Sequence, residues 1–218
     1  MNVDVKKFLN VHGQLAENEV KDLLKAFNIK TTVYELVKNP IDLKNIKLKY
    51  PVALKVCSRK ILHKTDVGGV TLDIKNFDEL EKTFTVFKKK FPEEIFLVEQ
   101  MQEKGVEIII GLVNDPTFGL SIMFGVGGIF TELYKDVSFR VVPIDEYDAK
   151  QMIEEIKGKK LFEGFRGFKA NKDIVVELLL KVSRFGESLM DRIDQMDLNP
   201  VFVYENSYCV VDAKLILK

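Results

Sequence analysis

Residues 51–72, PVALKVCSRKILHKTDVGGVTL, decide the fold, because they predict a strand, a loop and a second strand. Val52, Leu54 and Val56 alternate with small or charged residues, the period-2 pattern of a half-buried strand. Val70 begins the same pattern on the far side of the loop. The stretch therefore predicts two paired strands joined by a loop rich in charged residues and glycine.

This stretch could bind an anion. Lys55 lies in the middle of the first strand with only small neighbours on its face, and a lysine amine can reach a phosphate as a compact positive charge. Gly68 and Gly69 close the loop, and paired glycines let a backbone approach an anion closely. These residues alone leave two readings open. One is a phosphate-binding loop with His63 at its edge, and the other is an edge-strand lysine beside an ordinary hairpin loop.

Composition excludes several classes of protein. The chain has 218 residues, of which 46% are hydrophobic, enough for one sizeable domain or two small lobes. Lys+Arg and Asp+Glu both number 33, so no net field or basic block favours nucleic acid. No apolar run approaches the ~20 residues of a membrane span, and charges interrupt the N-terminal stretch, unlike a signal peptide. We therefore expect a cytoplasmic protein that binds neither nucleic acid nor membrane, with two buried, reduced cysteines, Cys57 and Cys209.

Helical and strand-like patterns alternate along the chain. The stretches with helical spacing are 16–27, 78–90, 145–157 and 173–193, with a short polar helix over 42–49. The strand-like stretches outside 51–74 are 31–37, 95–101, 106–113, 119–124 and 139–143, with a final hairpin over 201–217. Because hairpins imply antiparallel pairing, the predicted fold class is α+β.

The final hairpin allows a prediction of register. If Glu205 and Asn206 form a two-residue turn, counting back along both strands places Asn199 opposite Asp212. Directly opposed residues have Cβ atoms about 5 Å apart, so an amide oxygen and a carboxylate could share a hard cation such as Mg²⁺. The alternative is an Asn-Pro turn with a surface aspartate, and a three-residue loop would shift the register.

Three further carboxylates are candidates for a site. Glu99 and Glu107 fall on neighbouring predicted strands in apolar surroundings, where a carboxylate needs a partner. They could accept hydrogen bonds from a ribose or form salt bridges at a sheet edge. Glu132 and Arg140 both follow the glycine-rich residues 125–128, and a carboxylate there could orient an imidazole.

In this order, these pieces resemble an ATP-grasp domain and, more narrowly, the beta subunit of ADP-forming acetyl-CoA synthetase. The matching strings are PVALKVCSRKILHKTDVGGV, FLVEQM, VEIIIGLVNDPTFG, FGVGGIFTELYKDVSFRVVPI, LFEGFRG and DLNPVFVYENSYCVVDAKL. The combination of HKTDVGGV, GVGGIFTEL and DLNP with VVDAKL is far more specific than any one of them. Two departures, Asn28 where the family usually has glycine and a lysine-rich segment after Asn39, lie outside these nucleotide motifs.

The resemblance implies a single ATP-grasp domain over residues 1–218, with nucleotide bound between two α+β lobes. The smaller lobe would span about 25–98, and the larger about 99–218 plus the N-terminal segment. The implied reaction is acyl-CoA + ADP + phosphate ⇌ acid + CoA + ATP. It would need an alpha subunit that carries the CoA-binding domain and a phosphohistidine, in an expected α2β2 assembly.

The resemblance also implies roles for individual residues. Those expected at the nucleotide or its phosphate loops are Lys55, Gly68, Gly69, Glu99, Met101, Glu107, Gly127 and Gly128. Asn199 and Asp212 would hold Mg²⁺. His63 would be a phosphoryl carrier or a residue that only positions phosphate, with Glu132 as the acidic residue beside a phosphohistidine.

Two other functions compete with this one. A free-standing ATP-grasp ligase would join a carboxylate to an amine through an acyl phosphate and would not need a histidine such as His63. A regulatory nucleotide-binding module would have no turnover, which the joint presence of Lys55, Asn199 and Asp212 argues against.

Overall fold

The computed structural model of the chain falls into two compact units. It describes residues 11–61, 63–127, 136–163 and 170–218. The large unit comprises Met1–Leu15, Glu19–Thr31 and Lys104–Lys218, and the small unit comprises Ala16–Asn18 and Thr32–Glu103. Both units are discontinuous in sequence, and the assignment of one domain with two lobes stays a prediction.

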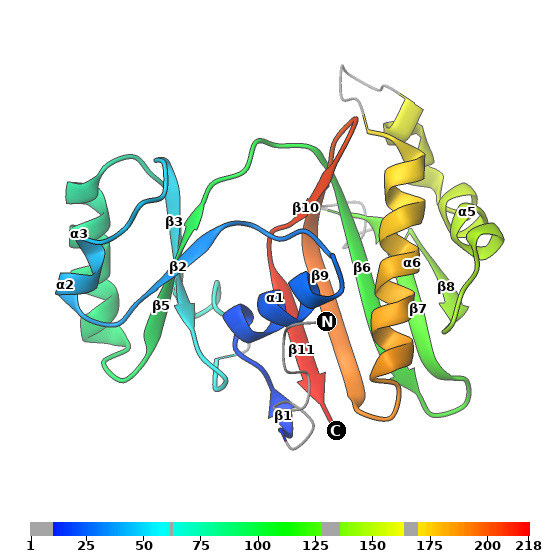
Figure 1. Cartoon of the computed structure of the whole chain (residues 1–218), viewed down its shortest axis with the longest axis horizontal. Coiled ribbons are helices and arrows are strands. Elements are labelled where there is room, and N and C mark those ends of the chain that lie inside the picture. The colour runs from blue at the N-terminus through cyan, green and yellow to red at the C-terminus, as the bar shows by residue number, and fades with distance from the viewer. Residues whose placement is uncertain (1–10, 62, 128–135, 164–169) are drawn as a thin grey trace. The chain divides into compact units, whose positions relative to one another are not determined.

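The small unit is an antiparallel sheet with two helices on one face (Figure 1). Its strands, in the order β2-β5-β3-β4, are β2 (Tyr34–Val37), β5 (Ile95–Gln100), β3 (Val52–Cys57) and β4 (Val70–Ile74). Its helices are α2 (Pro40–Leu43) and α3 (Phe77–Lys90). Leu54 and Val56 of β3 pack with Phe84 of α3 in the core, so the alternation of the strand turns Lys55 to the opposite face.

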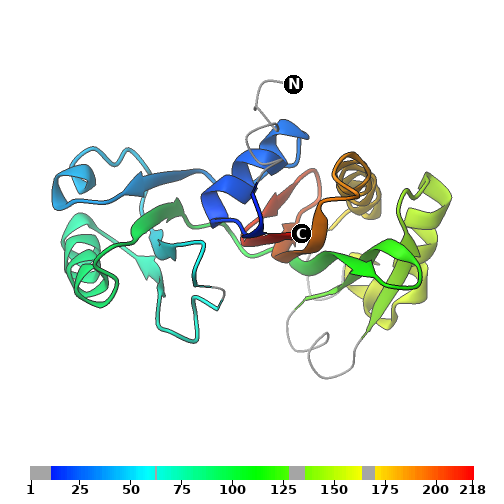
Figure 2. The same ribbon diagram turned by 90° about the horizontal axis from the view of Figure 1, so that it is seen from below.

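The large unit is a seven-stranded sheet whose one face is covered by α5 and α6 (Figures 1 and 2). The strands along its path are β1 (Gly13–Gln14), β11 (Ala213–Leu217), β9 (Ile193–Val203), β6 (Val106–Asp115), β7 (Gly119–Val126) and β8 (Val137–Val141), and β10 (Tyr208–Val210) pairs with β9. The helices are α1 (Glu17–Ala26), which belongs to this unit from Glu19 onward, α5 (Glu146–Glu155), α6 (Lys172–Ser188) and a 3₁₀ helix over Lys157–Glu163. Alternate residues of β6 and β7, among them Ile108, Ile110 and Ile122, are buried with these helices in the core of the unit.

The register predicted for the final hairpin is confirmed. β10 and β11 both pair antiparallel with β9, and Ala213 lies opposite Leu198. Across the two-residue turn, the N–H of Tyr204 donates to the carbonyl of Ser207 at 2.8 Å. The same register places Asn199 opposite Asp212, and the Asn199 N–H donates to the Asp212 carbonyl at 3.2 Å.

Two predicted helices were drawn too long. The helix expected over 173–193 ends at Ser188. Ile193 falls at helical spacing from the apolar residues of α6, but it is a buried residue of β9 that pairs with Leu217. In place of the helix expected over 42–49, the chain forms the short helix Pro40–Leu43. After this helix, alternating apolar residues pack against the core of the small unit. Among the described helices, none is both long and apolar enough to cross a membrane.

Candidate functional site

Lys55 is a buried interior lysine. β3 lies between β5 and β4, so the reading of Lys55 as an edge-strand lysine is wrong. Its side chain is 6% exposed and forms ion pairs with Glu99 at 2.5 Å and with Glu17 at 3.1 Å. A buried ammonium needs such partners, and this one is held by two carboxylates from different parts of the chain.

Glu99 lies on β5 beside Lys55, but the prediction that its strand neighbours the strand of Glu107 is wrong. β5 belongs to the four-stranded sheet of the small unit, whereas β6, which carries Glu107, belongs to the seven-stranded sheet of the large unit. The residues after β5 therefore connect two sheets. The Glu99 carboxylate is buried, pairs with Lys55 and accepts a hydrogen bond from the Thr32 hydroxyl.

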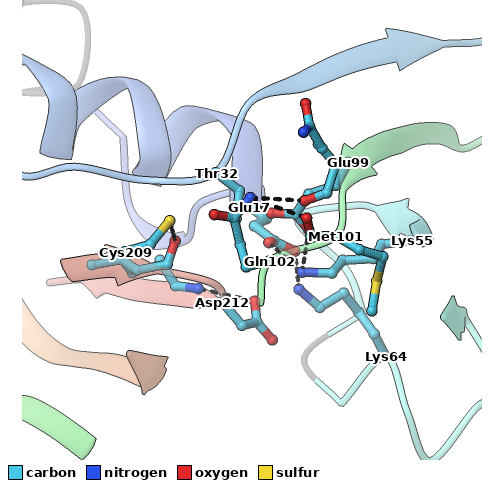
Figure 3. Close-up of polar contacts among 12 residues, drawn as sticks. Glu17, Thr32, Lys55, Lys64, Glu99, Met101, Gln102, Cys209 and Asp212 are labelled. Carbon is cyan, nitrogen blue, oxygen red and sulfur yellow. Dashed lines mark hydrogen bonds and ion pairs between the residues drawn. The ribbon is translucent and has the colours of Figure 1, made fainter. Parts of the chain in front are cut away.

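Sequence reasoning missed Glu17, the first residue of α1. Its buried carboxylate pairs with Lys55 through Oε1 and with Lys64 through Oε2 (Figure 3). We call Lys55, Lys64, Glu17 and Glu99 the lysine–carboxylate cluster, and all four residues belong to the small unit. An acidic residue in the first turn of a helix is common for electrostatic reasons alone, so no local pattern identified Glu17.

Backbone hydrogen bonds hold the loop after β3 against that strand. The Gly69 N–H donates to the Lys64 carbonyl at 2.6 Å, and the Val56 N–H donates to the Gly69 carbonyl at 2.8 Å. A Cβ on Gly69 would lie 2.5 Å from Val56 Cγ1, so only glycine fits there, while Gly68 has a φ of +59°. Both glycines therefore shape the loop, in which His63 is exposed.

Met101 follows directly after β5 and keeps the chain against the small sheet. Its N–H donates to the carbonyl of Pro51 at 3.2 Å, and its side chain is half-buried. The Gln102 amide donates to the carbonyls of Gln100 and Met101 at 3.1 and 3.4 Å. This stretch is therefore held by hydrogen bonds to backbone carbonyls of the small unit.

The predicted metal ligands lie together on the large unit. Asp212 accepts a hydrogen bond from the Ala213 N–H at 2.9 Å, and the side chain of Asn199 is exposed. Asp197 is a neighbouring carboxylate whose pKa is raised, chiefly by burial and further by Asp212, against the lowering effect of Lys214. The Asp197 carboxyl is therefore sensitive to the charges of both neighbours.

The donor set fits Mg²⁺. In the described part of the chain, no group of three or more His, Cys, Asp or Glu side chains could hold a metal ion. Asn199 and Asp212 would thus supply one amide oxygen and one carboxylate. Mg²⁺ is commonly held by one or two carboxylates, with substrate phosphates and water as its other ligands. Asn199 and Asp212 are the residues that would hold it here.

The glycine-rich end of β7 is only partly described. The Gly127 N–H donates to the Glu107 carbonyl at 2.8 Å, and a Cβ on Gly127 would lie 3.1 Å from the Glu107 Cβ. Gly127 therefore fits closely against β6, while Gly128 and Glu132 lie outside the described residues. Arg140 is held by α5, because Glu155 binds it at 2.5 Å and raises its pKa.

Both cysteines are free and buried, as predicted. Burial raises the pKa of the Cys57 thiol to about 11, against the smaller lowering effect of a hydrogen bond at Asn18. A thiol with so high a pKa is protonated at neutral pH and is a poor nucleophile. Cys57 is therefore a core residue of the small unit, although it lies on the same strand as Lys55.

Residues 10–217 match the family model described as an ATP-grasp domain. The chain is 44% identical to acetate–CoA ligase [ADP-forming] II subunit beta of Pyrococcus furiosus, over 94% of this chain and 92% of that protein. It is also 41% identical to acetate–CoA ligase [ADP-forming] II of Archaeoglobus fulgidus, over 93% of this chain. The chain spans only 30% of that longer relative.

Solved structures agree with these similarities. The chain matches dinucleotide-forming acetyl-coenzyme A synthetase 1 of Ca. Korarchaeum cryptofilum in complex with coenzyme A, Ca-AMPCP and HgCl⁺. The TM-score is 0.90 and the identity is 38%, with 98% of this chain and 97% of that chain covered. A second structure of that protein, with coenzyme A and Mg-AMPPCP, has its phosphohistidine segment pointing towards the nucleotide-binding site. It matches with a TM-score of 0.81 and 39% identity, over 94% of this chain and 93% of that chain.

Proposed function

The chain belongs to the ATP-grasp domain family, and from this premise we propose that it is the nucleotide-binding beta subunit of an ADP-forming acyl-CoA ligase. The observation that carries the proposal is the buried Lys55, fixed by two carboxylates in a chain 44% identical to such a subunit over 94% of its length. A lysine fixed in this way is suited to bind a phosphate, because it needs little reorganisation when the phosphate arrives.

The proposed reaction is acyl-CoA + ADP + phosphate ⇌ acid + CoA + ATP. The partner subunit would carry CoA and a phosphohistidine, and this chain would bind ADP and receive the phosphoryl group. Lys55 would contact the phosphates, while Glu99, Met101 and Glu107 would contact the adenine and ribose. Mg²⁺, when bound, would offset phosphate charge. The cytoplasmic location and the α2β2 assembly stay predictions.

We expect the isolated chain to produce no ATP from acetyl-CoA, ADP and phosphate, because the acyl-phosphate and CoA chemistry belongs to the partner. Adding a purified CoA-binding alpha subunit of the family should restore turnover. The measurement is ATP formation by a coupled luminescence assay, with the alpha subunit alone as the control. Full activity from this chain alone would instead favour a self-contained ligase.

We expect Asp212→Ala to abolish most of the Mg²⁺ dependence of ADP binding. One carboxylate ligand is lost, and Asn199 alone offers a single neutral oxygen to a hard cation. In calorimetry, Mg²⁺ should strengthen ADP binding to the unaltered chain, and the variant should lose about tenfold or more of that gain. Asp194→Ala, which removes an exposed carboxylate from β9, the strand that carries Asn199, is the matched control. Unchanged metal dependence in Asp212→Ala would refute the Asn199–Asp212 site.

A further inference from the structure

Lys64 is a buried residue in an exposed loop. Within residues 63–68, all of which are described, it is the one whose side chain is buried, at 8% exposure for the whole residue. Lysine is almost never buried unless its charge is paired. Its amine forms an ion pair with Glu17, so this contact anchors the loop at the residue that follows His63.

Glu17 binds two amines with its two oxygens. Oε1 lies 3.1 Å from Lys55 Nζ, and Oε2 pairs with Lys64 Nζ (Figure 3). The carboxylate is itself buried and binds both amines, so it fixes the spacing between them. Glu99 also pairs with Lys55, so the lysine–carboxylate cluster contains two positive and two negative side chains.

The backbone of the loop supports the same arrangement. The Lys64 carbonyl accepts from the Gly69 N–H, and the Gly69 carbonyl accepts from the Val56 N–H of β3. Lys64 is thus connected through both its side chain and its backbone to the strand that carries Lys55. Such double support fixes the position of a functional group better than one contact does.

We propose that Glu17 is a positioning residue that holds Lys55 and Lys64 as a pair of cations for the phosphates of the nucleotide. Lys64 is then a second phosphate-binding lysine. The inference rests on the proposed nucleotide-binding function. An ammonium group has three N–H donors, so an ion pair with Glu17 is compatible with a further bond from Lys64 to a phosphate oxygen. Amines already fixed before binding need little reorganisation when the phosphates arrive.

The test compares ADP with adenosine, because adenosine has no phosphate. Glu17→Gln and Lys64→Met are made in the complete chain, and both ligands compete with a fluorescent ATP analogue in the presence of Mg²⁺. ADP affinity should fall roughly 10- to 100-fold in each variant, the usual effect of removing a supporting partner. Adenosine affinity should change less than about twofold, since independent contacts contribute separately. Lys64→Met should add little in a Glu17→Gln background.

Glu154→Gln is the matched control. Glu154 also bridges two lysines, Lys159 and Lys172 at 2.9 Å each, but it lies on the surface of the large unit. It should leave both affinities unchanged. Glu17→Asp, which keeps the charge on a shorter side chain, should retain part of the ADP affinity lost in Glu17→Gln.

The outcomes separate this inference from the proposed function. Equal losses for ADP and adenosine would show a purely structural role, and tighter ADP binding in Glu17→Gln would show that Glu17 only repels phosphate. Either result overturns the inference. If Glu17→Gln does not fold, unchanged ADP affinity in Lys64→Met overturns it as well. An unaltered chain that binds no ADP would instead refute the proposed function.

Discussion

Lys55→Met is expected to destabilise the protein by about 3–5 kcal/mol and to reduce its affinity for ADP at least about 100-fold. The substitution leaves the buried carboxylates of Glu17 and Glu99 without the amine that pairs with both. Removing one partner of a buried ion pair is costly because the remaining charge stays desolvated. Urea unfolding followed by circular dichroism would measure the stability loss, and calorimetry would measure the affinity.

Two further variants separate the structural and binding effects of Lys55. Lys55→Arg keeps the charge, so the fold should be kept. Because the planar guanidinium of arginine differs in shape from a compact ammonium, ADP should still bind markedly less well. Lys150→Met removes an exposed lysine paired with Glu146 and should leave both properties nearly unchanged. If folded Lys55→Met bound ADP normally, Lys55 would serve only to balance Glu17 and Glu99.

The parts of the fold that follow from local chemistry could be predicted from the sequence. A two-residue turn fixes the register of a hairpin, because every later pair follows by counting, and this placed Asn199 opposite Asp212. Period-2 alternation likewise identified β3 and the face on which Lys55 lies. Both predictions used chain segments only a few residues apart.

The parts that depend on distant contacts could not be predicted in the same way. Glu17 and Lys64 are 47 residues apart, and nothing near either residue indicates that they meet. Glu99 and Glu107 are close in sequence, but the chain between them leaves one sheet for another. A sequence pattern reports burial and spacing, whereas pairing across a fold depends on topology. The end of α6 was misplaced for a related reason, since Ile193 suits a helical stripe and a buried strand equally well.

His63→Asn and His63→Ala are expected to abolish acyl-CoA turnover by the assembled enzyme while leaving nucleotide binding intact. His63 is exposed on a loop that is tied to β3, so it can meet a phosphoryl donor without unfolding the site. An imidazole nitrogen with a free lone pair can attack phosphorus. The P–N bond to the partner's histidine would break as a P–N bond to His63 forms. The phosphoryl group would then pass to a terminal oxygen of ADP, which leaves His63 unphosphorylated.

Asparagine tests this role because it keeps a polar side chain that can hydrogen-bond a phosphate but cannot carry a phosphoryl group. Turnover would be followed by ATP formation with the alpha subunit present, and ADP binding by calorimetry. Labelling with ³²P should show acid-labile phosphate on this chain in the unaltered enzyme and none in either variant. His12→Asn replaces the other histidine, which is exposed and lies within hydrogen-bond distance of the Lys218 carbonyl, at 2.6 Å. This control should change none of these measurements. Near-normal turnover in His63→Asn would mean direct transfer from the partner's histidine to ADP, with His63 only positioning phosphate.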